Sequence, residues 1–205
     1  MSQILPDILL ELIDSLTILP GVGPKSAQRM AVHLLLKKPN EAAKLAQNLQ
    51  QSLINVNKCD QCRALCETDI CKICKDTQRD RQTICVIETI GDLLSLEQTG
   101  TYKGLYFILM GSLSPIDRIG PDELGIPLLH QRVIEEAITE VILATNPTIE
   151  GEATAHYLTK KLPKNVKITR LASGIPVGTE LTYVNDHTLY HALACRKEVE
   201  RLTVD

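Results

Sequence analysis

The amino-acid sequence predicts a multidomain α/β protein with a helical front, a small cysteine-rich module and a mainly parallel sheet. Three observations support this fold class: apolar residues at helical spacing near the N-terminus, two CxxC pairs, and later apolar runs that alternate with helical patterns. A chain of 205 residues can hold several small domains. We expect a helical region over 1–56, a zinc finger over 57–78, an α/β domain over 79–172 and a C-terminal segment over 173–205.

The composition excludes several classes of protein. With 44% hydrophobic and 23% charged residues the chain can form a core, and with a single Phe and no Trp it lacks the aromatic platform that stacks single-stranded bases. No apolar run reaches the length of a membrane span, and the N-terminus has no basic start of a secretory signal. We therefore expect a cytoplasmic protein that has no membrane partner.

The first 56 residues predict three helices. Apolar residues at helical spacing indicate a first helix over 4–17, and a break at residues 20–24 separates it from a second helix over 25–36. We expect Asn40 to cap a third helix. Its inward face should hold Ala43, Ala46, Leu49 and Leu53.

The break between the first two helices, LPGVGPK, has two interpretations. It is either an ordinary turn or a helix–hairpin–helix that binds DNA. In the second case Gly21 and Gly23 let the backbone approach a DNA strand, the free amides of the next helix hold a phosphate, and Lys25 and Arg29 add charge. A nucleotide-binding phosphate loop is excluded, because Pro24 interrupts the motif and no strand precedes it. His33, Lys37 and Lys38 extend the basic patch or belong to a solvated helix face.

The cysteine pattern predicts one structural Zn²⁺ per chain. Two CxxC pairs, Cys59 with Cys62 and Cys71 with Cys74, are separated by eight residues and supply four thiolates. The alternative, a redox CxxC, does not normally occur twice in such a short segment. Three further thiols lie outside this pattern. We expect Cys66 to be a bystander in the finger, and Cys85 and Cys195 to be packing residues.

Behind the finger the chain alternates between buried strands and helices. Strands are expected over 83–87, 105–110, 141–144 and 166–171, with helices over 91–98, 128–138 and 151–162. A loop over 111–127, rich in Gly and Pro, should lie where the second strand ends. The charge also changes along the chain: residues 1–58 carry six Lys/Arg against four Asp/Glu, whereas residues 83–205 carry eleven against sixteen.

Carboxylates follow two of these strands, where a parallel sheet usually places its site. Glu88 comes directly after the first strand, and Glu150 and Glu152 follow the third. Such clusters are typical of metal sites for phosphate chemistry. However, two polar positions nearest the third strand are neutral, Asn146 and Thr148.

In chain order, LPGVGPKSA, the paired CxxC motifs, ICVIE, ATNPTIEGEAT and GIPVG closely resemble the RecR family of bacterial recombination mediators over essentially the whole chain. The resemblance implies a Toprim domain, the topoisomerase–primase fold, behind the finger. It also implies a homo-oligomeric ring, a tetramer, which binds duplex, single-stranded and gapped DNA at the nucleoid and loads recombinase with RecO and RecF. Ser173 and Thr179 depart from frequent family residues, and residues 199–205 resemble a variable tail.

Toprim enzymes hold Mg²⁺ with a glutamate after the first strand and an Asp-x-Asp after a later one. Here Glu88 matches the first position, and Asn146-Pro147-Thr148 replaces the second, followed by Gly151. Loss of two carboxylates should weaken Mg²⁺ binding, although Glu88, Asp92, Glu150 and Glu152 keep weak binding open. The two later glutamates also fit favourable charge at a helix N-terminus.

We therefore expect a non-catalytic DNA clamp and mediator whose acidic α/β domain, including Glu88, Asp92, Asn146, Glu150 and Glu152, docks a protein partner. The alternative is a metal-dependent Toprim enzyme that transfers phosphoryl groups, a nuclease or a primase-like protein. A zinc-ribbon transcription factor fits less well, because the chain has no basic recognition helix.

Overall fold

The computed structural model describes residues 4–172 and 174–196 in two compact units, residues 1–56 and the part of the chain from Asn57 onwards. Ser173 and the tail over 199–205, where the sequence predicted a family difference and a variable end, lie outside the described residues. Each unit is described by itself.

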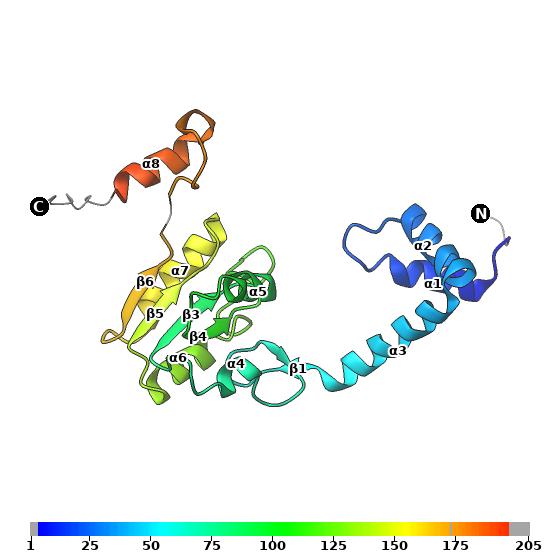
Figure 1. Cartoon of the computed structure of the whole chain (residues 1–205), viewed down its shortest axis with the longest axis horizontal. Coiled ribbons are helices and arrows are strands. Elements are labelled where there is room, and N and C mark those ends of the chain that lie inside the picture. The colour runs from blue at the N-terminus through cyan, green and yellow to red at the C-terminus, as the bar shows by residue number, and fades with distance from the viewer. Residues whose placement is uncertain (1–3, 173, 197–205) are drawn as a thin grey trace, which may run out of the picture. The chain divides into compact units, whose positions relative to one another are not determined.

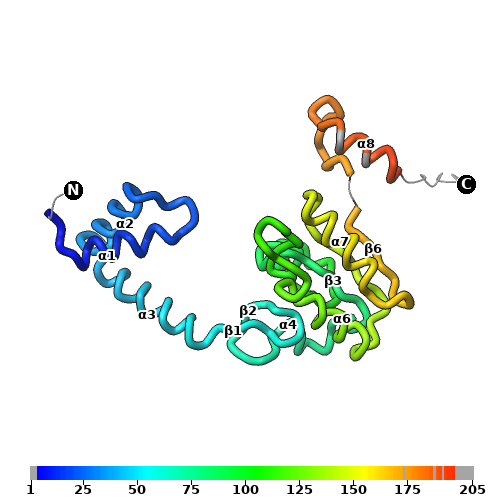
Figure 2. Tube along the Cα trace, turned by 180° about the vertical axis from the view of Figure 1, so that it is seen from behind, coloured from blue at the N-terminus to red at the C-terminus, as the bar shows by residue number. Residues whose placement is uncertain are grey.

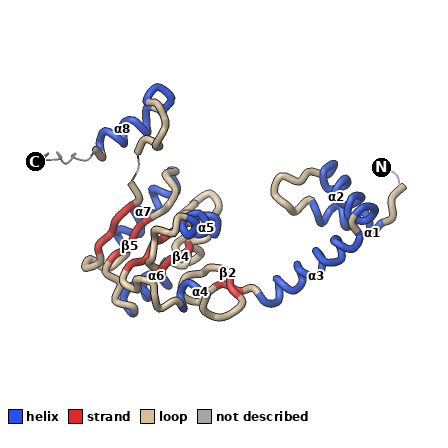
Figure 3. The backbone as a smooth tube through the Cα atoms, viewed as in Figure 1, coloured by secondary structure: helices blue, strands red, loops and turns tan. Residues whose placement is uncertain are grey.

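The front unit consists of α1 (Asp7–Leu16), α2 (Pro24–Lys37) and α3 (Pro39–Asn55), drawn as blue helices in Figure 3. The three predicted helices are thus confirmed. The cap at Asn40 is wrong: α3 begins at Pro39 with Lys38 in the cap position, and among the described residues no side chain caps it. Proline suits this position because its fixed φ is helical and it has no N–H to leave unpaired.

The inward face predicted for α3 is also wrong within a single chain. Leu49 and Leu53 are 60% and 76% exposed, and none of the residues of α3 is buried. In the described part of this unit the buried apolar residues are Ala27 and Ala31 of α2. Both alanines lie on α2, which packs against α1 and α3, and the apolar residues Leu49 and Leu53 of α3 have no cover among the described residues of this unit.

The second unit is built on a parallel sheet, as predicted (Figure 1). Its strands are β3 (Thr83–Ile87), β4 (Leu105–Ile108), β5 (Glu140–Leu143) and β6 (Lys167–Arg170), in the order β4-β3-β5-β6. Val86 at the centre of β3 is in register with Phe107 of β4 and Leu143 of β5. The connecting helices are α5 (Ile90–Gln98), α6 (Ile126–Glu135) and α7 (Ile149–Lys161). The predicted loop links β4 to α6.

The sheet has a core on each face, and Figure 2 shows it from behind. On one face Leu129 of α6 and Leu158 of α7 pack with Val86 and Phe107. On the other face Leu93 of α5 and the cysteine module pack with β3 and β4. Burial on both faces explains why these strands are continuous apolar runs rather than alternating patterns.

The cysteine module contains β1 (Asn57–Lys58), β2 (Leu65–Cys66) and the short α4 (Lys72–Lys75). It covers the edge strand β4: the backbone N–H of Ile108 donates to the Cys62 carbonyl at 3.0 Å. An uncovered edge of a sheet is a template for unwanted pairing. The module therefore shields the edge of the sheet in addition to carrying the cysteine cluster.

The C-terminal segment contains a 3₁₀ turn, η1 (Leu181–Tyr183), and α8 (Asp186–Ala194). In the described part of the chain, each helix is too short or too polar to cross a bilayer.

Candidate metal centre and Toprim cleft

The four cysteines of the CxxC pairs, Cys59, Cys62, Cys71 and Cys74, come together in one buried cluster. One sulfur from each lies within 4.8 Å of the others, and the Sγ atoms of Cys62 and Cys71 are 3.5 Å apart. Zinc–sulfur bonds of about 2.3 Å place tetrahedral ligands about 3.8 Å apart, so the donor set fits a four-cysteine zinc site. Among the described residues this is the group of three or more metal-ligating side chains that the fold assembles.

Backbone amides of the two turns point at the sulfurs. Ala64 N–H donates to Cys62 Sγ at 3.5 Å, Cys71 N–H to Cys59 Sγ at 3.3 Å, and Cys74 N–H to Cys71 Sγ at 3.4 Å. Hydrogen bonds of this type favour thiolate over thiol. The contact with Cys62 lowers the pKa of Cys71, and the same contact raises the pKa of Cys62. A metal ligand must be deprotonated, and the amide donors favour that form of the cysteines.

The three other cysteines lie outside this cluster. Cys66 donates to the carbonyl of Thr68 at 2.8 Å. Cys85 is buried in β3, and burial raises its pKa to about 12, so it remains a thiol that packs. The packing role predicted for Cys195 is wrong, because this residue follows the end of α8 and is exposed.

Two arginines join the cysteine module to the sheet domain, and sequence reasoning identified neither. Arg63 reaches the β4–α6 loop, donating to the carbonyls of Leu109 at 2.9 Å, Glu123 at 2.8 Å and Leu124. Arg132 of α6 reaches the cysteine cluster itself. Their carbonyl partners lie 26 to 71 positions away in sequence, so no local motif pointed to these contacts.

Glu88 stands where β3 ends and is only 6% exposed. Its carboxylate accepts two hydrogen bonds from Asn146, which follows β5: the backbone N–H donates to Oε1 at 3.1 Å and the side-chain amide donates to Oε2. A cleft at this edge of the sheet is lined by Asn146 together with Asp92 and Arg170. Glu88 and Asn146, which the sequence places after two separate strands, are thus in direct contact.

The segment after β5 is held against Glu88 by tight packing. Thr148 caps α7 by accepting from Gly151 N–H at 3.1 Å, and Thr145 donates to the Gly151 carbonyl at 3.0 Å. A Cβ on Gly151 would lie 2.0 Å from the Asn146 carbonyl oxygen and 2.9 Å from Glu88 Oε1. Glycine is therefore required here, because any side chain would push α7 away from the strand ends.

The remaining acidic residues have other partners or open surroundings. Asp92 forms a capping box with Thr89 at the start of α5, a role that the Thr-x-x-Asp pattern could have predicted. Glu152, in the first turn of α7, pairs with both guanidinium nitrogens of Arg170 at 2.6 and 2.8 Å. Glu150 lies in the same turn and is exposed.

The glycine turn has the geometry of an accessible helix N-terminus. Gly21 has a φ of +77°, which favours glycine, whereas Gly23 has an ordinary φ of −86°. A Cβ on Gly23 would meet no described atom within 4 Å, so the described fold itself does not require glycine there. Lys25 and Arg29 are both exposed on α2.

Comparisons with known proteins agree with this architecture. Family models match the chain as a Toprim domain over residues 82–172, a RecR helix-hairpin-helix over 9–53 and a RecR C-terminal segment over 174–196. The fold and the sites define a Toprim protein of DNA recombination, with a helix–hairpin–helix in front of the Toprim domain and a cysteine module that fits zinc.

The chain belongs to the RecR family. It is 50% identical over 193 residues to the recombination protein RecR of Hydrogenovibrio crunogenus, covering 94% of this chain and 98% of that protein. It is 49% identical over 190 residues to the recombination protein RecR of Saccharophagus degradans, covering 92% and 96%.

Proposed function

We propose that this protein is a non-catalytic, DNA-binding mediator of recombinational repair that, with RecO and RecF, loads recombinase onto gapped or damaged DNA at the nucleoid in the cytoplasm. The observation that carries the non-catalytic assignment is the pairing of Glu88 with Asn146. The Glu88 carboxylate accepts hydrogen bonds from two amide groups of Asn146. Neither group carries a negative charge that a cation would have to offset. Phosphoryl transfer in this fold class depends on such a cation.

The helix–hairpin–helix is the proposed contact with duplex, single-stranded and gapped DNA. The start of α2 supplies free amides, and Gly21 and Gly23 leave room for a phosphate strand to approach. Lys25 and Arg29 on the same helix add charge that is independent of DNA sequence. His33 and Lys37 continue the basic surface along α2, and Lys38 follows the end of this helix.

The proposed cofactor is one structural Zn²⁺ per chain, held by Cys59, Cys62, Cys71 and Cys74. Four protein ligands leave no open position for a substrate, so the metal would stabilise the module rather than react. Mg²⁺ binding at Glu88 would be weak.

The proposed assembly is a homo-oligomeric ring, a tetramer, with DNA inside. The apolar residues Leu45, Leu49 and Leu53 occur at intervals of four on α3 and are all more than half exposed. Residues at this spacing lie on one face of a helix, and exposed apolar stripes of this kind mark interfaces between proteins. A second copy of the chain would cover them.

The acidic edge of the Toprim domain is the proposed surface for a protein partner. Glu150 is exposed there, and carboxylates repel DNA but attract a basic protein. The alternative function, a metal-dependent nuclease or primase-like enzyme, would need Glu88, Asp92, Glu150 and Glu152 to converge on one cation. Among the described residues Asp92 instead caps α5 and Glu152 pairs with Arg170, which supports the mediator.

The DNA contact is tested by reversing one charge. Lys25→Glu should weaken binding to duplex and gapped DNA alike by severalfold and lower the slope of affinity against salt by about 1. Lys44→Glu, the same change at an exposed position of α3, is the matched control and should bind DNA with an affinity close to that of the wild type. Equal affinities for both variants and the wild type would remove the hairpin as the DNA contact.

A further inference from the structure

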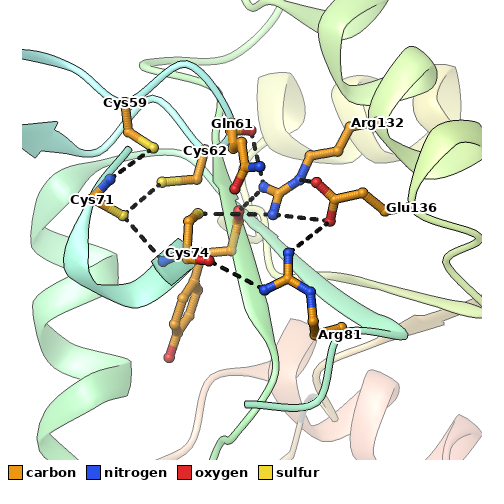
Figure 4. A network of polar contacts seen from close by, with 9 residues as sticks. Cys59, Gln61, Cys62, Cys71, Cys74, Arg81, Arg132 and Glu136 are labelled. Atoms are coloured by element: carbon orange, nitrogen blue, oxygen red, sulfur yellow. Dashed lines mark hydrogen bonds and ion pairs between the residues drawn. The ribbon is translucent and has the colours of Figure 1, made fainter. Parts of the chain in front are cut away.

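Arg132 is a charged residue of α6 that is buried, with only 4% of its side chain exposed. Its guanidinium joins parts of the chain that lie far apart in sequence (Figure 4). Nη1 donates to the carbonyls of Gln61 at 2.9 Å and Tyr106 at 3.0 Å, Nη2 lies 3.8 Å from Cys74 Sγ, and Nε donates to Glu136 at 3.0 Å. Burial of an arginine is costly unless every donor finds a partner, and this arrangement provides them.

The contact between Arg132 and Cys74 brings a positive charge to a site where zinc binding would bury negative charge. A Zn²⁺ with four thiolates carries a net charge of −2, and the four cysteines are buried. Arg132 places a positive charge at Cys74 Sγ. Arg81 adds a second, donating to the Cys74 carbonyl at 3.2 Å and lying 3.8 Å from Glu136. The carboxylate of Glu136 stands between the two arginines and fixes the first of them in place.

Geometry shows why this residue is an arginine. Gln61 belongs to the cysteine module, whereas Tyr106 belongs to the edge strand β4. Nη1 of the planar fork binds both carbonyls, while Nη2 contacts Cys74 Sγ and also donates to Glu136 Oε2 at 3.4 Å. A lysine ammonium has three donors but lacks this rigid spread, so it cannot reproduce all of these contacts at once.

We propose that Arg132 is a positioning residue of the metal site: it stabilises the metal-bound Cys74 thiolate and couples retention of zinc to docking of the cysteine module on β4. This inference rests on the zinc occupancy proposed above. Outer-shell partners of metal ligands commonly change metal affinity by about 10–100-fold when they are removed.

The first test is competition for zinc. Purified full-length protein is titrated with a chromophoric chelator, and the zinc affinity of the wild type is compared with that of Arg132→Met and Arg132→Lys. We expect Arg132→Met to lose about 10–100-fold in affinity, with Arg132→Lys between it and the wild type. Lys72→Met, which removes an equal charge from an exposed residue beside Cys71, is the matched control and should retain zinc as the wild type does.

The second test is specific to the thiolate. In the Co²⁺-substituted protein, loss of a hydrogen bond to sulfur makes the thiolate a stronger donor, so the sulfur-to-cobalt charge-transfer band should move to lower energy. We expect this shift in Arg132→Met and not in Lys72→Met. A purely architectural role for Arg132 would change stability and leave the band in place.

The outcomes separate the two proposals. A wild-type protein without bound zinc would contradict the zinc assignment itself. A zinc-loaded wild type whose Arg132→Met variant keeps the same affinity and the same cobalt band would overturn the role of Arg132. If Arg132→Met does not fold, Arg132→Lys decides, because wild-type affinity and an unshifted band in that variant would also overturn it.

Discussion

Asn146 donates two hydrogen bonds to the buried carboxylate of Glu88, one from its backbone and one from its side chain. The pair links the ends of β3 and β5, strands that are neighbours in the sheet. With an aspartate in place of Asn146, two negative charges would meet where one is buried, and a cation would be needed between them. The amide turns the same position into a donor, so the Glu88 carboxylate has a hydrogen-bond partner there in place of a second negative charge.

The first prediction follows from this pair. Asn146→Asp should lower the free energy of unfolding by about 1–3 kcal/mol near neutral pH, because a donor becomes a like charge. Since the folded state raises the pKa of the new carboxyl, the penalty is absent at acidic pH and grows as pH rises through that value.

Thermal unfolding with and without Mg²⁺ checks this. Mg²⁺ should raise the Tm of Asn146→Asp and leave the wild type nearly unchanged. A variant as stable as wild type at neutral pH, with no response to Mg²⁺, would show that Glu88 does not depend on the amide.

A second prediction contrasts two glycines. Gly151→Ala should destabilise the Toprim domain by about 1–3 kcal/mol, because its Cβ would overlap the Asn146 carbonyl. Gly23→Ala has open space and an ordinary φ, so it should change stability little and instead weaken DNA binding. Denaturant unfolding and DNA titration of both variants would test the contrast, and equal stability losses would argue against it.

These positions also show how far the sequence could predict the fold and the sites. Strands β3 and β4 were predictable because burial on both faces makes them short apolar runs. The cysteine cluster was predictable because its spacing is set by metal geometry. Glu88 and Asn146 were assigned to one site because parallel strands end at one edge of a sheet, but their direct contact was not predicted. The partners of two other carboxylates were not predicted either. Asp92 accepts from the backbone N–H of Thr89, and Glu152 pairs with Arg170.

Other features were beyond local pattern reasoning. Arg132 looks like a solvated helix residue in sequence, and only the tertiary fold brings it to Cys74. Leu49 and Leu53 have the spacing of an inward face, but no described element of the same chain covers them. Periodicity identifies an apolar face and does not tell whether the chain itself or another molecule buries it.

A third prediction concerns the metal centre. Cys71→Ser should lose zinc and yield misfolded or aggregated protein, because the module has little apolar core beyond its ligands. Cys66→Ser, a thiol of the same module outside the cluster, should retain one zinc per chain and fold normally. Metal analysis and circular dichroism check both variants. A soluble, zinc-free and DNA-binding Cys71→Ser protein would contradict a structural role for the metal.

A fourth prediction concerns self-association. Leu49→Glu places a charge on the exposed apolar face of α3 and should shift the protein to smaller species in size-exclusion chromatography with light scattering. Gln50→Glu adds the same charge at the next position, also exposed, and should leave the assembly intact. An unchanged mass for Leu49→Glu would place the interface elsewhere.

The central claim, that the Toprim edge binds and does not react, is tested most directly by a turnover assay. Purified protein is incubated with gapped and single-stranded DNA in Mg²⁺ or Mn²⁺, and cleavage and synthesis are followed alongside DNA binding, with Glu88→Gln as the control. The account predicts retained binding and no turnover in either protein. Turnover by the wild type that Glu88→Gln abolishes would contradict it and make this protein a metal-dependent enzyme.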